Sequence, residues 1–472
     1  MQHYHYVYLL GIGGIGMSAL ARWMHYLSRK VFGYDSTATP LTASLVKEGI
    51  PISFDNSPAA IPPEILQKKA QSLVVYTPAI PASNPILHYF RTQGYAVCKR
   101  AEIVGALTQD FCTVAVAGTH GKTTSTALVT HILHQARKSI IALVGGILQD
   151  YNTNFITHGS PTKDTIVVVE ADEFDRSFLH LHPDLAIITT VDADHLDIYS
   201  DQPGVYSGFQ AFIQRLPTTQ QLIIHQKAAQ ALSLTSAATR YAFTNAPVHA
   251  ENVHHHQGYC RFDYISPQTT LRNLHLASPG HHQIENALAV ITACLALGIN
   301  EADIRKGIHT FPGIKRRFEY IMQHNKLVFI DDYAHHPTEI TALLQGLRAH
   351  YPNQKVTIIF QPHTYTRTRD FAAAFAQSLD LADQVLLLAI YPAREEPIPG
   401  ITSALIRDQM QLQSKRLCTK AQVLEHLAQE ELTEVIVTVG AGDIAALVAP
   451  IREQLLQRIE AREATAKRPT GA

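Results

Sequence analysis

A glycine-rich segment at residues 118–124 carries the residue types that bind a nucleoside triphosphate. It reads Gly118, Thr119, His120, Gly121, Lys122, Thr123 and Thr124. An expected buried strand at residues 113–117 precedes the segment and an expected helix follows it. In this context the backbone N–H groups of the loop can surround phosphates. The lysine would then meet the β- and γ-phosphates, and Thr123 would ligate Mg²⁺. Val116 stands where the Walker A pattern has its first glycine, which makes the loop a variant. We predict ATP as its ligand, with a ligand-free surface turn as the alternative.

Acidic residues and a histidine follow the next two expected strands, at residues 165–169 and 185–191. They are Glu170, Asp172 and Glu173 after the first strand, and Asp192, Asp194, His195 and Asp197 after the second. Because the carboxyl ends of parallel strands meet at one edge of a sheet, these side chains are expected to face the phosphate loop. Carboxylates suit Mg²⁺ and a neutral imidazole can complete the shell of a second metal ion. The alternative is a set of solvated loop acids.

A second glycine-rich segment near the N-terminus has the G-x-G-x-x-G pattern of a dinucleotide-binding turn. Its glycines are Gly11, Gly13 and Gly16, with Gly14 in addition, and Asp35 follows at the end of an expected second strand, where an acid could bind a ribose. The pattern leaves three interpretations open: NAD, another nucleotide diphosphate, or a turn without a ligand. A second nucleotide-type loop in the same chain disfavours a simple dehydrogenase, which needs one dinucleotide and no ATP.

Basic residues follow two expected strands in the last third of the chain. His335 comes after the strand at 327–330 and Arg367 after the strand at 356–360. Cations at strand ends suit an anionic substrate or a γ-phosphate. The tract His254, His255 and His256 is different, because it lies in a predicted insert without a companion carboxylate. We interpret it as a solvated hairpin tract rather than a metal site.

Taken together and in this order, the segments resemble the Mur ligase family over nearly the whole chain. The matching stretches are residues 11–18, 118–124, 170–173, 194–197, 316–319, 331–337 and 440–444. The resemblance implies an α/β protein of three domains: a Rossmann-like N-terminal domain at 1–107 that holds a UDP-sugar, a P-loop-type central ATPase domain at 108–312, and a Rossmann-like C-terminal domain at 313–472 that holds an amino acid.

The resemblance also implies roles for single residues. The implied catalytic residues are Lys122, His195, His335 and Arg367. The implied ATP-binding residues are Gly118, Thr119, His120, Gly121, Lys122, Thr123, Thr124, His282 and Asn286. The UDP-sugar would contact Gly11, Gly13, Gly14, Gly16, Ser18 and Asp35. Thr123 and Glu170 would hold one Mg²⁺ ion and His195 a second. Two positions depart from the family pattern: Gln283 stands where many relatives have asparagine, and Thr364 where some have a further arginine.

The implied reaction is ATP-dependent ligation of L-alanine to the lactyl carboxylate of UDP-N-acetylmuramate through an acyl phosphate, in peptidoglycan precursor synthesis. Sister ligases use a carbamoylated lysine downstream of the Asp-His motif, and residues 209–215 offer none, which favours the alanine-adding type. Three alternatives stay open: a ligase that recycles a whole peptide onto the same sugar, an NAD-dependent oxidoreductase, and a non-catalytic nucleotide-binding regulator.

These residues must be positioned by a repeated strand–turn–helix pattern, which indicates parallel sheets covered by helices. Further expected strands lie at residues 6–10, 72–76, 385–390 and 435–439, with helices at 17–27 and from Pro337 onward. Short alternating segments at 221–278 predict an antiparallel insert, and Pro312-Gly313 is a candidate hinge. The charged tail after Ile451 predicts a helix that frays at its end.

Composition limits the class of protein. The 472 residues are 46% hydrophobic and 17% charged, with 39 Lys and Arg against 40 Asp and Glu, which predicts a globular protein without non-specific nucleic-acid or membrane binding. The five cysteines are dispersed, which favours a reducing cytoplasm over a disulfide framework. The uncharged stretch at 6–21 contains four glycines and no preceding Lys or Arg, so we expect a strand and helix there and no membrane insertion.

Overall fold

The computed structural model describes residues 3–192, 202–235, 237–256, 259–277, 280–324, 327–393, 395–429 and 432–466. By its internal contacts the chain forms two compact units. Unit 1 comprises Met1–Val253, Phe262–Leu276 and Gln283–Pro312; unit 2 comprises His254–Arg261, Ala277–His282 and Gly313–Ala472. Within the described part of the chain no helix combines the length and apolar character needed to cross a membrane.

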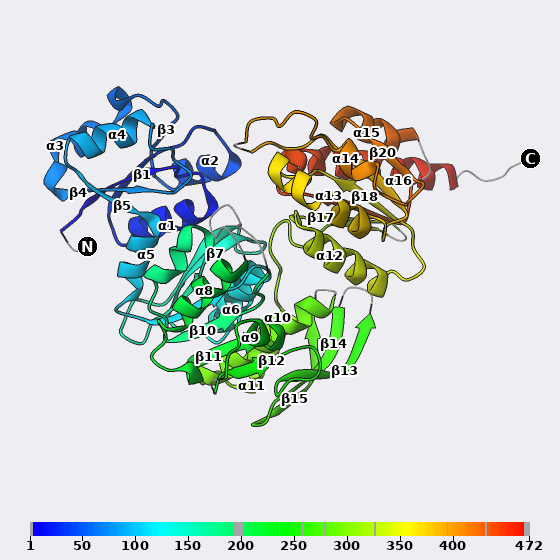
Figure 1. Cartoon of the computed structure of the whole chain (residues 1–472), viewed down its shortest axis with the longest axis horizontal. Helices are drawn as coiled ribbons and strands as arrows, with labels where there is room; N and C mark the ends of the chain where they lie inside the picture. The colour runs from blue at the N-terminus through cyan, green and yellow to red at the C-terminus, as the bar shows by residue number, and fades with distance from the viewer. Residues whose placement is uncertain are drawn as a thin grey trace, which may run out of the picture. The chain divides into compact units, whose positions relative to one another are not determined.

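Unit 1 opens with a five-stranded parallel sheet in the order β3-β2-β1-β4-β5 (Figure 1). Its strands are β1 Tyr6–Leu10, β2 Lys30–Tyr34, β3 Ile52–Ser53, β4 Ser72–Tyr76 and β5 Ala96–Lys99. The connecting helices are α1 Ile15–Tyr26, α2 Pro40–Lys47, α3 Pro63–Gln67 and α4 Pro85–Thr92, and α5 Arg100–Thr108 leads to the next sheet. The predicted strands at 6–10 and 72–76 are confirmed, and Asp35 directly follows β2 as expected.

The second sheet of unit 1 has seven strands in the order β12-β11-β10-β6-β9-β7-β8. They are β6 Cys112–Ala117, β7 Ile140–Leu148, β8 Thr153–His158, β9 Ile166–Glu170, β10 Leu185–Ile188, β11 Leu222–His225 and β12 Thr239–Tyr241. Only β8 among these pairs antiparallel, against β7. The associated helices are α6 Lys122–Gln135, α8 Gln202–Ile213, α9 Gln226–Ala231, α10 His281–Ala296 and α11 Glu301–His309. The apolar β6 is fully buried from Val114 to Ala117, as a central parallel strand requires.

The predicted antiparallel insert begins later than expected. Residues 222–225 and 239–241 form β11 and β12, which extend the main sheet in parallel, so the prediction of an insert from residue 221 was wrong there. The apolar run Leu222 to Ile224 is buried and pairs with β10, which explains the difference. The insert itself is the three-stranded sheet β13 His249–His256, β14 Tyr259–Ile265 and β15 Thr270–Leu276. Only two residues separate β13 from β14, so this pair can only be antiparallel.

Unit 2 is built on a six-stranded sheet in the order β16-β17-β21-β18-β19-β20. The strands are β16 Glu319–His324, β17 Leu327–Asp332, β18 Val356–Phe360, β19 Gln384–Leu387, β20 Lys415–Leu417 and β21 Val435–Val439. Its helices are α12 Pro337–His350, α13 Tyr365–Leu379, α14 Ala404–Arg407, α15 Lys420–Gln429 and α16 Val448–Ala466. All pairs are parallel except β16 with β17. The expected helix start at Pro337 and the expected strands at 356–360 and 435–439 are confirmed.

Candidate active site

The phosphate-type loop joins β6 to α6 at the carboxyl edge of the second sheet. Gly121 is the residue before the helix and has φ +81°, a left-handed conformation that L side chains rarely adopt. A Cβ at this position would lie 2.6 Å from Asn286 Oδ1, so the loop and α10 meet without room for a side chain. The first backbone N–H groups of α6 have no partner within the helix itself, and an anion can bind to such groups.

Two threonines that follow β10 fix the same loop. Thr189 Oγ1 donates a hydrogen bond to the His120 carbonyl, and the backbone of His120 donates to Thr190 Oγ1 at 2.9 Å. Thr119 N donates to the Thr190 carbonyl at 3.0 Å, and Thr119 Oγ1 accepts from Asp192 N at 2.7 Å. The loop is thus held from the adjacent strand before any ligand binds.

Lys122 is held by a buried carboxylate that sequence reasoning had not assigned to it. Its Nζ donates to Gly118 O at 2.5 Å and lies 2.9 and 2.8 Å from the two oxygens of Glu173. Burial alone would lower the pKa of Lys122, but Glu173, Asp172 and Glu170 outweigh that effect and hold it above its usual value. The lysine therefore carries a positive charge throughout the physiological pH range.

The two residues predicted to bind Mg²⁺ in the described part of the chain lie together. Thr123 Oγ1 donates to Glu170 Oε1 at 3.1 Å, and Glu170 Oε2 accepts from the Gly145 backbone at 3.0 Å. Oxygen ligands of this kind suit a hard cation. His195, Asp194 and Asp197, also predicted at this edge, lie outside the described residues.

The N-terminal glycine turn is closed by Asp35. Gly11 has φ +81° and donates to Tyr34 O at 2.8 Å, while Gly13 donates its backbone N–H to Asp35 Oδ2 at 2.8 Å. A Cβ on Gly13 would lie 2.9 Å from the same carboxylate oxygen, so a larger residue there would have to displace the Asp35 side chain. Gly14 N closes the turn by donating to Gly11 O at 3.1 Å.

Ser18, which was predicted to contact the UDP-sugar, lies inside the protein. Ser18 is fully buried, donates to Ile15 O at 2.9 Å and accepts from Asn154 at 3.0 Å, so its predicted contact with a substrate stays a prediction.

Sequence reasoning missed Arg100, whose guanidinium lies 3.9 Å from Asp172 and beside Gly16. Its position directly after β5, at the carboxyl end of a parallel strand, was the signal that could have identified it.

In unit 2, His335 lies in the loop between β17 and α12. Its Nδ1 lies 3.0 Å from Tyr333 O and its backbone N–H donates to Glu339 at 2.9 Å. Burial lowers the pKa of His335, Arg367 and Arg317 lower it further, and Glu339 opposes them. The imidazole is thus favoured in its neutral form beside the guanidinium of Arg367.

Arg367 lies in the first turn of α13, whose N-terminus is fixed by an acid from a distant loop. Glu395 accepts from the backbone N–H groups of Tyr365 at 2.6 Å and of Thr366 at 2.9 Å. The preceding Thr364 has φ +65°, which is uncommon for a residue with a side chain. Arg367 lies close enough to His335 to lower the pKa of its imidazole, so both residues belong to one region of unit 2, while their roles stay predictions.

Comparison with known proteins shows which family the chain resembles. Three family models match: Mur ligase family, catalytic domain, at residues 6–112; Mur ligase middle domain at 116–294; and Mur ligase, glutamate ligase domain, at 316–450. The UDP-N-acetylmuramate–L-alanine ligase of Flavobacterium johnsoniae is 44% identical, covering 96% of this chain and 98% of the relative. That of Parabacteroides distasonis is 41% identical, with coverages of 96% and 98%.

Among solved structures, the chain is similar to ligases of the same family. The UDP-N-acetylmuramate-alanine ligase of Thermotoga maritima matches with a TM-score of 0.80 and 28% identity, covering 96% of this chain and 99% of that one. A murein peptide ligase from Psychrobacter arcticus matches with a TM-score of 0.68 at 22% identity, covering 96% and 98%. At that identity the second likeness shows the fold alone, which is the three-domain α/β fold expected from the sequence.

Proposed function

Since the chain belongs to the Mur ligase family, we propose that it joins L-alanine to the lactyl carboxylate of UDP-N-acetylmuramate with the hydrolysis of ATP. The observation that carries the proposal is the phosphate loop with its charged Lys122 and the Thr123–Glu170 pair, in a chain 41–44% identical to ligases of that name. The product would enter peptidoglycan precursor synthesis.

The chemistry requires activation of a carboxylate, which is a poor electrophile at neutral pH. We propose that the lactyl carboxylate attacks the γ-phosphorus of ATP, so that ADP leaves and an acyl phosphate forms. The amine of L-alanine then attacks the acyl carbon, loses a proton and displaces phosphate. Because the carboxylate and the triphosphate are both anionic, the enzyme's task is positioning and charge neutralisation. Lys122, held at Gly118 O and Glu173, supplies a fixed cation beside the backbone N–H groups of the loop.

Mg²⁺ fits the oxygen donors present at this edge of the sheet. Thr123 and Glu170 would hold it, with His195 proposed for a second ion. When bound, Mg²⁺ neutralises charge on the phosphates and on the approaching carboxylate. A hydrogen bond from the Gly145 backbone orients the Glu170 carboxylate, which supports this assignment.

The remaining assignments distribute the substrates over the three domains, which we place at 1–107, 108–312 and 313–472. The turn of Gly11, Gly13, Gly14 and Gly16, with Ser18 and Asp35, would hold the UDP-sugar. Thr119, His120, Thr124, His282 and Asn286 would complete the ATP site. His335 and Arg367 would reach the substrate carboxylate and the transferring phosphate. We propose a cytoplasmic location.

The test is phosphate release by the purified full chain, with ATP, UDP-N-acetylmuramate and L-alanine supplied together and with each omitted in turn. We expect release only with all three, and trapping of a hydroxamate when hydroxylamine replaces the amino acid. In a parallel assay with NADH added, a change in NADH absorbance without phosphate release would instead identify an oxidoreductase. Nucleotide binding without turnover would identify a regulator.

A further inference from the structure

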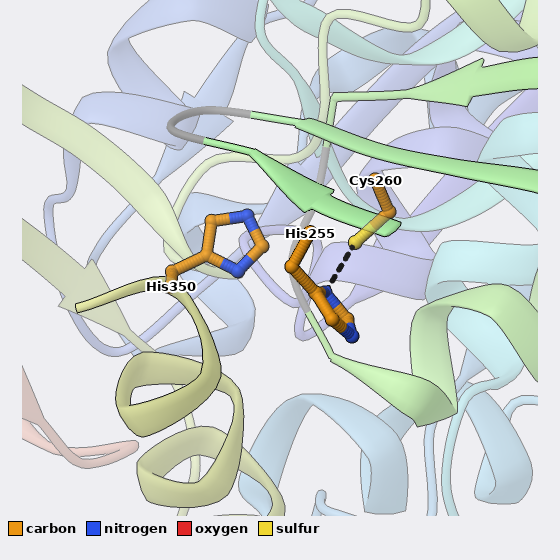
Figure 2. Close-up of side chains that lie close together, drawn as sticks. All are labelled: His255, Cys260 and His350. Atoms are coloured by element: carbon orange, nitrogen blue, oxygen red, sulfur yellow. Dashed lines mark hydrogen bonds between the residues drawn. The ribbon is translucent and has the colours of Figure 1, made fainter. Parts of the chain in front are cut away.

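The hairpin of the insert carries a cluster that the proposed reaction does not use. Among the residues that the structure describes, His255, Cys260 and His350 have ligand atoms that all lie within 4.8 Å of one another. Figure 2 shows His255 and Cys260 on the two strands of the hairpin and His350 at the end of a helix. All three belong to unit 2. The interpretation of residues 254–256 as a merely solvated tract was therefore wrong for His255, whose neighbours are a thiol and a second imidazole.

Two of the three residues are buried, His255 is half-buried, and one of the buried side chains has polar atoms without a hydrogen-bond partner in the described part of the chain. Cys260 is fully buried and His350 is only 6% exposed. His255 Nδ1 lies 3.1 Å from Cys260 Sγ, but neither ring nitrogen of His350 has a hydrogen-bond partner in the described part of the chain. Burying an imidazole without any partner is costly, so its position next to a thiol and a second imidazole calls for a ligand.

We propose that His255, Cys260 and His350 form a binding site for a divalent transition metal, with Zn²⁺ as the natural occupant. Two imidazoles and a thiolate are borderline-soft ligands that suit Zn²⁺ or Co²⁺ and not Mg²⁺. Ligand atoms around a tetrahedral Zn²⁺ are about 3.5 Å apart, given Zn–N and Zn–S bonds of about 2.0 and 2.3 Å. The observed spacing, from 3.1 Å to at most 4.8 Å, needs only a small side-chain rotation to reach that geometry.

The surroundings support a cation at this place. His350 is the last residue of α12, a 14-residue helix, and the carbonyl end of a helix favours positive charge. On binding, the Cys260 thiol loses its proton to solvent and the sulfur forms a bond to the metal, with no change in oxidation state. The three side chains leave one tetrahedral position for water or another donor. The bound ion would fasten the end of the β13–β14 hairpin to α12.

The site can be tested with Co²⁺, whose bond to a thiolate gives a charge-transfer band in the near ultraviolet. The full chain is stripped with a chelator, placed in excess Mg²⁺ to occupy oxygen sites, and titrated with Co²⁺ and then Zn²⁺. We expect one equivalent of Co²⁺ to produce the band and Zn²⁺ to abolish it, since Zn²⁺ binds such sites more tightly.

Variants identify the ligands. Cys260→Ser should remove the band, and His350→Gln should weaken Co²⁺ binding by more than the roughly 10- to 100-fold seen for outer-shell partners of a metal. The matched controls are His254→Gln, an exposed neighbour on the same strand, and Cys98→Ser, a half-buried thiol on β5. Both should bind Co²⁺ as the parent chain does.

Thermal unfolding gives a second readout that does not depend on the band. Zn²⁺ should raise the midpoint temperature of unfolding of the parent chain and of both controls, but not that of His350→Gln. This comparison tests the proposal even if Cys260→Ser does not fold. The proposal is overturned if the parent chain shows no thiolate band, or if Cys260→Ser retains it.

Discussion

At the scale of single residues, the site is organised around a cation that is paired before the nucleotide arrives. Lys122 is only 12% exposed and its Nζ lies within hydrogen-bond distance of both oxygens of Glu173, whose side chain is 2% exposed. Such a pair restricts the long lysine side chain to one position at the mouth of the loop. Incoming phosphates would then meet a positioned charge instead of ordering a free one.

Replacing Lys122 tests this role. Lys122→Ala should lower kcat by roughly 10³-fold or more, because the transferring phosphoryl group loses its fixed cation. The measurement is steady-state phosphate release, with Lys138→Ala, an exposed lysine just beyond α6, as the matched control. Because the change leaves Glu173 buried without its partner, thermal unfolding must show that the variant is folded. Turnover near that of the parent in a folded variant would exclude the assignment.

Removing the carboxylate of Glu170 tests the metal site. Glu170→Gln should raise the Mg²⁺ concentration needed for half-maximal rate by roughly 10-fold or more, since even outer-shell partners of a metal are worth that much. The control is Asp175→Asn, because Asp175 belongs to the same segment but pairs with Lys99 at 2.7 Å. Equal Mg²⁺ dependence in the two variants would show that Glu170 is not a ligand.

At the scale of elements, the sequence predicted which strands bear the chemistry but not how their loops support one another. The loop after β6, Glu170 at the end of β9 and Asp192 after β10 were expected at one edge because parallel strands share that edge. The pairing of Lys122 with Glu173, and the hydrogen bonds of Thr189 and Thr190 to His120, depend on the mutual placement of three loops, which local pattern does not encode. The parallel strand β11 was missed for a similar reason, because a short apolar run does not reveal its partner.

The junction between the loop and α6 gives a prediction of its own. Gly121→Ala should destabilise the chain by more than the about 1–2 kcal/mol that a left-handed conformation costs a residue with a side chain, because its Cβ would also meet Asn286. Gly49→Ala is the matched control: Gly49 has φ +89° and no atom within 4 Å of the added Cβ. Urea unfolding measures both. Equal losses would mean that the contact with Asn286 is unimportant.

A buried histidine that joins two helices of unit 1 makes the fold sensitive to acid. His131 on α6 hydrogen-bonds Tyr151 and Thr310 at 2.9 Å each, and burial, with His134 and Lys306 contributing, lowers its pKa from 6.5 to about 4. Between these pH values the unfolded chain binds the additional proton, so stability is lost as pH falls from about 6.5 towards 4.

For this one group the loss at pH 5 relative to pH 7.5 amounts to about 2 kcal/mol, at about 1.36 kcal/mol per pKa unit. His131→Gln keeps hydrogen-bonding capacity without titrating, so it should flatten that part of the pH dependence. Urea unfolding of the parent and the variant at the two pH values measures the difference. An unchanged pH dependence in His131→Gln would contradict the assignment.

At the scale of the whole molecule, the three larger of the four described sheets each carry residues that we propose to bind one of the substrates. The fold class could be predicted because glycine turns, strand runs and helix starts recur along the sequence in a family pattern. Selectivity for the amino acid could not be predicted, because it depends on how side chains from distant parts of the sequence pack around that substrate. An experiment on substrate preference therefore tests the proposed function most directly.

The most direct test compares kcat/KM for L-alanine, glycine, L-serine and the tripeptide L-Ala-D-Glu-diaminopimelate, with ATP and UDP-N-acetylmuramate saturating. We predict that L-alanine is the best substrate and the tripeptide is excluded by its size. Glycine and L-serine should be slower but measurable, because one small group in a pocket is worth about 1–3 kcal/mol, or roughly 10- to 200-fold. A higher kcat/KM for the tripeptide than for L-alanine would contradict the account and identify a peptide-recycling ligase.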